Sequence, residues 1–221
     1  MKLQNIKEQL LTELAKEKCL QQYKISKKDF AFKKSDKEVE LMIDFTNNHW
    51  PDEIHLFPYV YIKIKKVHEI CNMFNFDLNY TAFINLFILE KVVNGEFDED
   101  TRWKLQSEFK DRFILLSEDI SDMMVKMKQF LSYAMDYIHE NTTIEAIDKM
   151  YNENPTYEYN PNCSDMSCHC VIGMIAAKLS NNPNFLQLTN TYSDIVNSKP
   201  RGFVSEEIDS FNRIKEYLIN M

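Results

Sequence analysis

The chain has 221 residues, of which 44% are hydrophobic, enough to bury the core of one domain, with or without an appendage. Its formal net charge of −8 argues against broad attraction to nucleic acid or to an anionic membrane. With three glycines, it has no phosphate-binding loop of the Walker or dinucleotide type, and it has no G-x-S-x-G elbow or H-E-x-x-H pair. These observations favour a protein without catalytic activity, and no catalytic residue is predicted.

Charge is distributed unevenly along the chain. Residues 1–116 hold 18 Lys and Arg against 19 Asp and Glu, whereas residues 117–221 hold 8 against 15. This asymmetry predicts two sub-structures with different surfaces. We expect a helix plus an antiparallel sheet over residues 1–116, and a helical half over residues 117–221 that packs on it within one compact unit.

The compartment is predicted from what the sequence lacks. No apolar run is long enough to span a membrane, and the first residues lack the apolar core of a signal peptide. The five cysteines are an odd number without the spacing of a disulfide scaffold, which suits a reducing compartment. We therefore expect a cytoplasmic protein that does not bind membranes. The sequence does not indicate an oligomeric state.

The first predicted elements are a helix and a short strand. Apolar residues recur every three or four positions over residues 3–18, which predicts an amphipathic helix. Phe30 and Phe32 alternate with polar residues over residues 29–34, which predicts a strand that ends at a turn near Ser35.

Residues 38–67 give the strongest structural pattern. Two runs of alternating apolar and polar residues flank a turn over residues 47–52, so a β-hairpin is predicted. Pro58 cannot donate a hydrogen bond to a neighbouring strand, which places its strand at an edge of the sheet or at a bulge. The residues expected on the core face are Val39, Leu41, Ile43, Phe45, Ile54, Leu56, Val60, Ile62 and Ile64.

Three further elements are predicted before residue 117. Residues 67–74 have helical spacing. Residues 80–93 are apolar on both faces, a pattern shared by a covered strand and a buried helix, and we favour the strand. Alternation of Trp103 and Leu105 predicts a last short strand over residues 101–106.

Helical spacing replaces alternation from Ser117 onward. Ser117 is the expected N-cap of a Met-rich helix that runs to about residue 138, and residues 142–145 resemble a capping box for a helix starting at Ile144. Further helices are expected over residues 168–179 and 182–196, and a last one is capped by Ser205. The predicted fold class is α+β, with an N-terminal helix, an antiparallel sheet of about four to five strands, and a helical C-terminal half.

One dense cluster of reactive side chains lies within residues 162–170. Cys163, Cys168, His169 and Cys170 offer thiolate and imidazole ligands that suit zinc, and Asp165 adds a carboxylate. Cys168 is also placed near a helix N-terminus, where the helix dipole stabilises a thiolate. The alternative, which is the commoner role of such thiols, is packing at the start of a helix. The spacing lacks a second, distant ligand pair, so no cofactor is expected unless zinc binds here.

A second candidate site lies on the predicted hairpin. His55, Tyr59 and Tyr61 project on the face opposite the predicted core and, together with Trp50, would form a polar and aromatic patch that binds a protein partner. The alternative is an ordinary solvated sheet surface.

Two other patterns favour structural roles. Lysines between residues 24 and 37 surround aromatic residues, as in proteins that bind single-stranded nucleic acid, but Phe30 and Phe32 are needed for the core and the chain is acidic. No nucleic-acid partner is therefore expected. The methionines at 123, 124, 127 and 135 follow helical spacing, which more often marks a core face than a binding groove.

The order of the elements invites comparison with a known family. The segments FAFKK, VELMIDF, VYIKIKKVHEICNMF, TRWKLQ and MIAAKLSNNPNF follow one another in the chain. In this order the chain resembles a bacterial family of small α+β proteins known only as a domain of unknown function. The resemblance supports the fold class and implies no activity.

Two functional hypotheses follow. The first is a non-catalytic protein-binding module of an immunity or regulatory type, because small acidic proteins can neutralise basic partners. The second is a metal- or thiol-dependent protein that uses residues 163–170.

Overall fold

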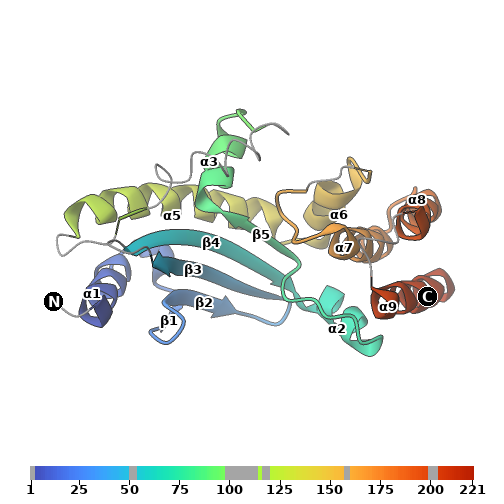
Figure 1. The fold of residues 1–221 in the computed structure, drawn as a ribbon, viewed down its shortest axis with the longest axis horizontal. Helices are drawn as coiled ribbons and strands as arrows, with labels where there is room; N and C mark the ends of the chain where they lie inside the picture. Colours follow the sequence, from blue (N-terminus) through green and yellow to red (C-terminus); the bar gives the residue numbers. More distant parts are fainter. Residues whose placement is uncertain (1–2, 50–53, 98–113, 116–119, 157–159, 199–203) are drawn as a thin grey trace. The chain divides into compact units, whose positions relative to one another are not determined.

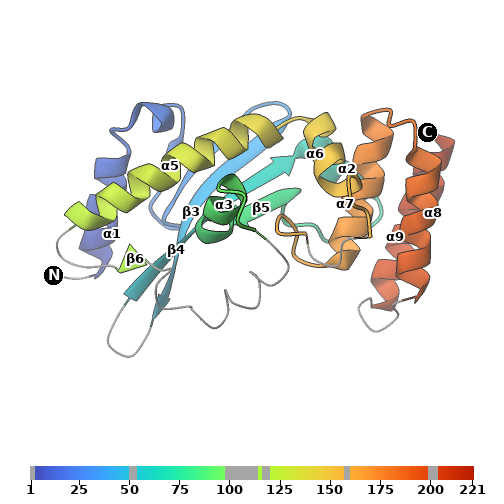
Figure 2. The ribbon, with the colours of Figure 1, turned by 90° about the horizontal axis from the view of Figure 1, so that it is seen from above.

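The computed structural model describes residues 3–49, 54–97, 114–115, 120–156, 160–198 and 204–221 (Figures 1 and 2). The elements before residue 100 are α1 (Leu3–Leu14), the 3₁₀ turn η1 (Lys18–Leu20), β1 (Lys24–Ser26), β2 (Ala31–Ser35), β3 (Val39–His49), β4 (Ile54–Ile64), α2 (Lys65–Met73), β5 (Ala82–Asn85) and α3 (Leu86–Val93). The later elements are β6 (Ile114–Leu115), α5 (Ser121–Asn141), α6 (Ile144–Asn152), α7 (Met166–Leu179), α8 (Phe185–Ser198) and α9 (Ser205–Asn220).

Contacts within the chain divide it into two compact units. The sheet unit comprises Met1–Asp36, Glu40–Tyr61 and Ile84–His139. The helical unit comprises Lys37–Val39, Ile62–Phe83 and Glu140–Met221. Among the described helices, none is both long and apolar enough to cross a membrane.

The predicted α+β fold class is confirmed, since an N-terminal helix and an antiparallel sheet precede a helical C-terminal half. The strands lie in the order β1-β2-β3-β4-β5, and β6 also pairs with β4. The predicted hairpin is confirmed as β3 and β4, and β2 pairs antiparallel with β3, placing Phe32 opposite Ile43.

Alternation along the hairpin places one face of each strand in the core. Of the residues predicted there, the side chain of Ile54 lies outside the described part, and the others are all buried: Val39, Leu41, Ile43, Phe45, Leu56, Val60, Ile62 and Ile64. In the sheet unit, the Phe45 ring contacts those of Phe30, Phe32 and Phe130 edge-on, with centroids 5.6, 6.0 and 6.5 Å away. Figure 2 shows α5, which carries Phe130, crossing β3 and β4. Aromatic packing against α5 therefore covers this face of the sheet.

Of the two positions predicted from Pro58, an edge or a bulge, the edge does not hold for β4 as a whole. β4 lies inside the sheet, with β3 on one side and both β5 and β6 on the other. β6 pairs opposite His55 and Leu56, and Thr81 N donates to Ile62 O just before β5 begins (2.9 Å). Pro58 thus lies between two short partner strands, where its missing N–H costs little.

Other expected boundaries need correction in the first half of the chain. Only residues 82–85 of the strand predicted over 80–93 are extended, because the Asn85 side chain accepts from Ile88 N (2.9 Å) and caps α3. The first helix ends at Leu14, and β1 and β6 were not predicted. The strand expected over residues 101–106 lies outside the described residues.

The helical unit is arranged around α7. This helix contacts α2, α6, α8 and α9, and every residue from 167 to 177 is buried. Figure 1 shows α7 among α6, α8 and α9. Its sequence, MSCHCVIGMIAAKL, is apolar on all sides, as expected for a helix enclosed by other helices. Gly173 permits a close approach of Tyr192 from α8, because a Cβ at residue 173 would lie 2.3 Å from Tyr192 Oη.

Local hydrogen bonds explain where the later helices start. α6 starts at Ile144 as predicted, but its cap is Thr143 alone, which accepts from Ala146 N (3.2 Å). α7 starts two residues earlier than expected, at Met166, because Asp165 caps it.

The last two helices also differ slightly from the prediction. α8 begins at Phe185 rather than at Pro183, and α9 begins at Ser205 itself, with Val204 as the N-cap residue. The expected cap at Ser117 lies outside the described residues.

Candidate functional site

The cysteine-rich segment forms the loop before α7 and its first turn. Asp165 is the N-cap, and its Oδ1 accepts from the backbone N–H of Cys168 (2.8 Å) and from Ser167 Oγ (2.7 Å). Ser164 Oγ donates to the other carboxylate oxygen (2.8 Å). Burial raises the pKa of Asp165, but these hydrogen bonds outweigh it and hold the pKa below its ordinary value. The first turn of α7 therefore carries a fixed negative charge.

Cys163 and Cys168 lie close enough for their thiols to form a hydrogen bond. The bond from Cys168 is the largest factor that lowers the pKa of Cys163, and the same bond raises the pKa of Cys168. The Cys163 Sγ–H donates to the Asp165 carbonyl oxygen (3.3 Å). The ionisation of one thiol therefore opposes the ionisation of the other.

The backbone on either side of Cys163 is held by several hydrogen bonds. Cys163 N donates to Asn160 O (3.1 Å), and the carbonyl of Asn162 accepts from Phe83 N (3.1 Å) and from the Tyr151 hydroxyl (3.2 Å). That hydroxyl also lies 2.7 Å from the Thr81 carbonyl. Cys163 therefore stands on a fixed segment beside the start of β5.

His169 lies in a different environment from Cys163 and Cys168. Its side chain is 2% exposed, and its ring lies 5.2 Å from that of Tyr151 and 5.9 Å from that of Tyr192. Neither ring nitrogen forms a hydrogen bond. Burial lowers the pKa of His169 to about 4, so the imidazole is neutral at pH 7. It packs between two tyrosines.

Of the four predicted metal ligands, the structure brings Cys163 and Cys168 together. Cys170 is completely buried. Across the residues that the structure describes, no group of three or more His, Cys, Asp or Glu side chains could hold a metal ion. Zinc at this cluster stays a prediction.

The predicted partner-binding residues lie on β4 as far as they are described. The rings of Tyr59 and Tyr61 stack at 5.5 Å, and Phe57 contacts Tyr59 edge-on at 5.1 Å. Phe57 also stacks on Phe87 of α3 at 5.9 Å. These side chains form a continuous aromatic row that is half-buried. Trp50 and the side chain of His55 lie outside the described residues.

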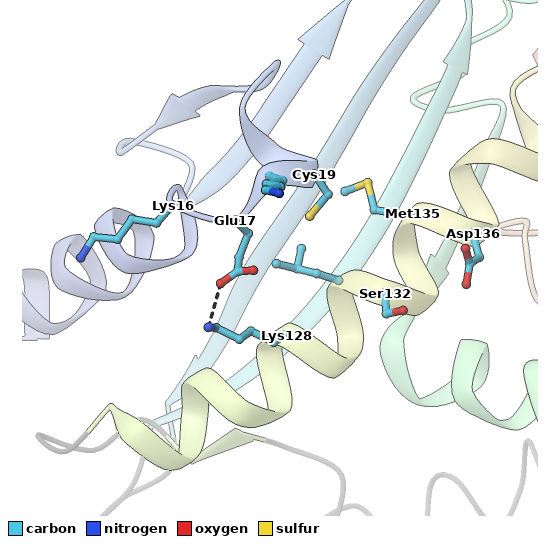
Figure 3. A pocket seen from close by; sticks show the side chains of 9 residues that line it. Lys16, Glu17, Cys19, Lys128, Ser132, Met135 and Asp136 are labelled. Carbon is cyan, nitrogen blue, oxygen red and sulfur yellow. Dashed lines mark ion pairs between the residues drawn. The ribbon is translucent and has the colours of Figure 1, made fainter.

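The sheet unit also has an open pocket of about 540 Å³ that the sequence did not predict. It lies between α5 and the segment that joins α1 to η1, and Glu17 Oε1 pairs with Lys128 Nζ across it at 2.8 Å (Figure 3). Cys19, Ser132 and Asp136 also line it. Helical spacing places residues on α5, but no sequence pattern brings the 3₁₀ turn against them, so the pocket had no signal in the sequence.

The lysine run and the methionines take structural roles in the described residues. Phe30 and Phe32 are buried, so their rings do not form a stacking surface for bases. Lys27 pairs with Glu8 at 3.0 Å and Lys33 with Asp29 at 2.6 Å. The buried members of the methionine stripe are Met123 and Met127.

Comparison with known proteins does not assign this chain to a family. The chain matches no protein-family model, no curated protein and no solved structure.

Proposed function

We propose that this chain is a thiol-dependent protein in which Cys163 and Cys168 interconvert between a dithiol and a disulfide. The observation that carries the proposal is that both cysteines contact the N-cap residue of α7: the Cys163 thiol donates to Asp165 O (3.3 Å), and Cys168 N donates to Asp165 Oδ1 (2.8 Å). A disulfide requires Cα atoms within about 7 Å and a sulfur–sulfur bond of about 2.05 Å, and two cysteines held against one N-cap residue are placed to meet this requirement.

The surroundings of the pair also favour reversible chemistry. Cys163 lies in the loop and is half-buried, so an oxidant reaches it from solvent, whereas Cys168 is buried. An accessible thiol of lowered pKa next to a resolving thiol is the arrangement typical of redox-responsive cysteines. A cytoplasmic location, which we also propose, would keep the pair reduced until an oxidant appears.

The test is an equilibrium titration in mixtures of reduced and oxidised dithiothreitol. All three cysteines of the segment fall in one tryptic peptide, residues 150–178, because it contains no internal Lys or Arg. A Cys170→Ser variant therefore isolates the pair. We expect this peptide to lose two hydrogens on oxidation and to regain them on reduction. A peptide that stays reduced until the chain unfolds would rule out the proposal.

Zinc binding by the same cluster is the competing use of these thiols. Elemental analysis of protein purified without chelator separates the two uses, because a bound metal would block both sulfurs. Less than about a tenth of an equivalent of zinc excludes the metal site and leaves the dithiol.

A second candidate function is protein binding through the aromatic row of β4, in a regulatory or immunity role. Stacking of Tyr59 on Tyr61 favours it, because rigid aromatic side chains are enriched where proteins associate. The net charge of −8 suits a basic partner. Neither nucleic acid nor membrane is proposed as a partner.

Affinity capture tests this candidate by comparison of matched variants. Immobilised wild-type chain should retain a basic protein that a Tyr59→Ser/Tyr61→Ser variant loses, and a Lys128→Ser variant should retain it. Equal retention by all three chains would remove the aromatic row from consideration.

A further inference from the structure

We infer that the pocket of the sheet unit binds a short zwitterionic peptide, namely an apolar dipeptide with free termini. The pocket lies between α5 and the segment that joins α1 to η1, and its volume of about 540 Å³ is within the range of small-molecule sites. The inference does not depend on the dithiol of the helical unit. It rests on the pairing of the charges around the pocket, on the size of the pocket and on its apolar floor.

Most of the charges around the pocket are balanced within the protein. Glu17 Oε1 lies 2.8 Å from Lys128 Nζ at one end of the pocket (Figure 3). Lys16 Nζ lies 2.6 Å from Glu13 Oε2, and Figure 3 shows the Lys16 side chain pointing away from the other labelled residues. A ligand in the pocket therefore meets these side chains as neutral pairs.

Lys18 and Asp136 are the charged lining residues without such a partner. Among the described residues, no hydrogen bond or ion pair involves the Lys18 ammonium or the Asp136 carboxylate. They belong to opposite walls, since Lys18 begins η1 and Asp136 lies on α5, at the end remote from the Glu17–Lys128 pair (Figure 3). An ammonium binds a carboxylate and a carboxylate binds an ammonium, so a ligand that satisfies both walls carries one group of each kind.

The size of the pocket sets the length of this ligand. A sphere of the same volume is about 10 Å across, and α5 rises about 12 Å from Lys128 to Asp136. The termini of an extended dipeptide lie about 7 Å apart, and a charge-assisted hydrogen bond of about 2.8 Å at each end extends the span to about 12–13 Å. The two charged groups of a single amino acid are about 3 Å apart, which is too short to join opposite walls.

The floor of the pocket suits apolar side chains. Leu131 is 2% exposed, and Met135 is half-buried. Cys19 and Met135 extend their sulfur-bearing side chains from the two walls (Figure 3). Methionine adapts to apolar groups of different shapes, which favours aliphatic side chains on the ligand. Ser132, on the same wall as Met135, offers a hydroxyl that can donate to or accept from a peptide group.

The test is a calorimetric titration with the dipeptide alanyl-leucine, its two blocked forms and free leucine. N-acetylation removes the ammonium, and C-terminal amidation removes the carboxylate. We expect alanyl-leucine to bind with a Kd below about 1 mM. Each blocked form, and leucine, should bind at least about tenfold more weakly, because one of the two charged contacts is lost.

Matched variants assign each terminus of the dipeptide to a side chain. Asp136→Asn should weaken binding of alanyl-leucine about tenfold and abolish its advantage over the N-acetyl form. Lys18→Gln should have the same effect relative to the amidated form. Lys16→Gln is the control: because the Lys16 ammonium already pairs with Glu13, this variant should bind the dipeptide within about twofold of the wild-type affinity.

Alkylation of Cys19 locates the bound dipeptide. Trypsin releases Cys19 in a peptide of its own, residues 19–24. Saturating alanyl-leucine should slow the reaction of Cys19 with iodoacetamide at least about fivefold and leave Cys163 in the same sample unaffected.

Several outcomes would overturn the inference. No binding of alanyl-leucine at about 10 mM, or equal affinity for all four probes, would exclude a zwitterion site. Unchanged binding in Asp136→Asn or in Lys18→Gln would show that the walls do not hold the two termini. Binding without protection of Cys19 would place the ligand outside this pocket.

Discussion

The sheet unit and the helical unit bury different chemistry. In the sheet unit, the described core is aliphatic and aromatic, with Phe45 at its centre. All the buried polar side chains of the described residues belong to the helical unit: His68, Thr81, Asn160, Ser167, His169, Thr189, Ser193 and Ser210. The sheet unit should therefore respond to loss of apolar volume, and the helical unit to pH and redox conditions as well.

The largest expected effect is in the sheet unit. Phe45→Ala removes a completely buried ring that contacts three others, and we expect it to lower the free energy of unfolding by about 3–5 kcal/mol. Phe57→Ala, on the half-buried face of β4, is the matched control and should cost less than about half as much. Urea denaturation measures both values. Equal losses would show that burial does not determine how much stability each of these two rings contributes.

Acidification should act on the helical unit instead. Burial lowers the pKa of His68 and of His169 from 6.5 to about 4. The unfolded chain therefore binds more protons between these pH values, so stability is fully present above pH 6.5 and falls as the pH approaches 4. The expected loss is on the order of 3 kcal/mol for each imidazole.

Urea denaturation at several pH values measures this loss of stability, and hydrogen exchange should show that it occurs in the helical unit. His169→Leu removes two unpartnered nitrogens, so it should be neutral or stabilising at pH 7 and should flatten the acid loss. An unchanged pH dependence in His169→Leu would contradict the account of this imidazole.

Close packing inside the helical unit predicts a smaller effect. Gly173→Ala would place a Cβ 2.3 Å from Tyr192 Oη and 2.7 Å from its ring carbon Cζ. Tyr192 is held by bonds to Tyr151 O (3.1 Å) and Asn152 Oδ1, so it does not yield easily. We expect a loss of about 1–3 kcal/mol despite the higher helix propensity of alanine.

A double-mutant cycle shows whether that contact is the cause. In a Tyr192→Phe background, which lacks the hydroxyl, Gly173→Ala should cost less than in the wild-type chain. If the losses of unfolding free energy in the two single variants simply add in the double variant, contact with the Tyr192 hydroxyl is not the cause of the Gly173→Ala loss.

The smallest effect is expected at the surface of the sheet unit. Glu17 and Lys128 form an ion pair at 2.8 Å, with side chains 32% and 53% exposed. Glu17→Gln should therefore change the free energy of unfolding by less than about 1 kcal/mol, and added salt should reduce the difference. A loss larger than that of Gly173→Ala would mean that the pocket is structurally essential.

Alternation and helical spacing predicted the parts of the fold that depend on burial. The core face from Val39 to Phe45 follows from a period of two. The same patterns were wrong where a single local group decides the outcome. Asn85 turns a run that is apolar on both faces into a helix, and Pro58 is accommodated between two short strands.

The candidate site was predicted in composition but not in geometry. The sequence placed Cys163, Cys168 and His169 together as ligands. Side-chain directions around the first turn of α7 then separate them, so that the thiols meet while the imidazole packs between Tyr151 and Tyr192. Tyr192 comes from α8, far along the sequence, and no local pattern indicates that contact.

The most direct test of the central claim is differential alkylation of all five cysteines before and after mild oxidation of the folded wild-type chain. We expect Cys163 and Cys168 to change together and to recover together on reduction. Buried Cys71 and Cys170 should stay unlabelled until unfolding, and exposed Cys19 should react on its own. If Cys163 and Cys168 are modified independently of each other, they are not a redox pair.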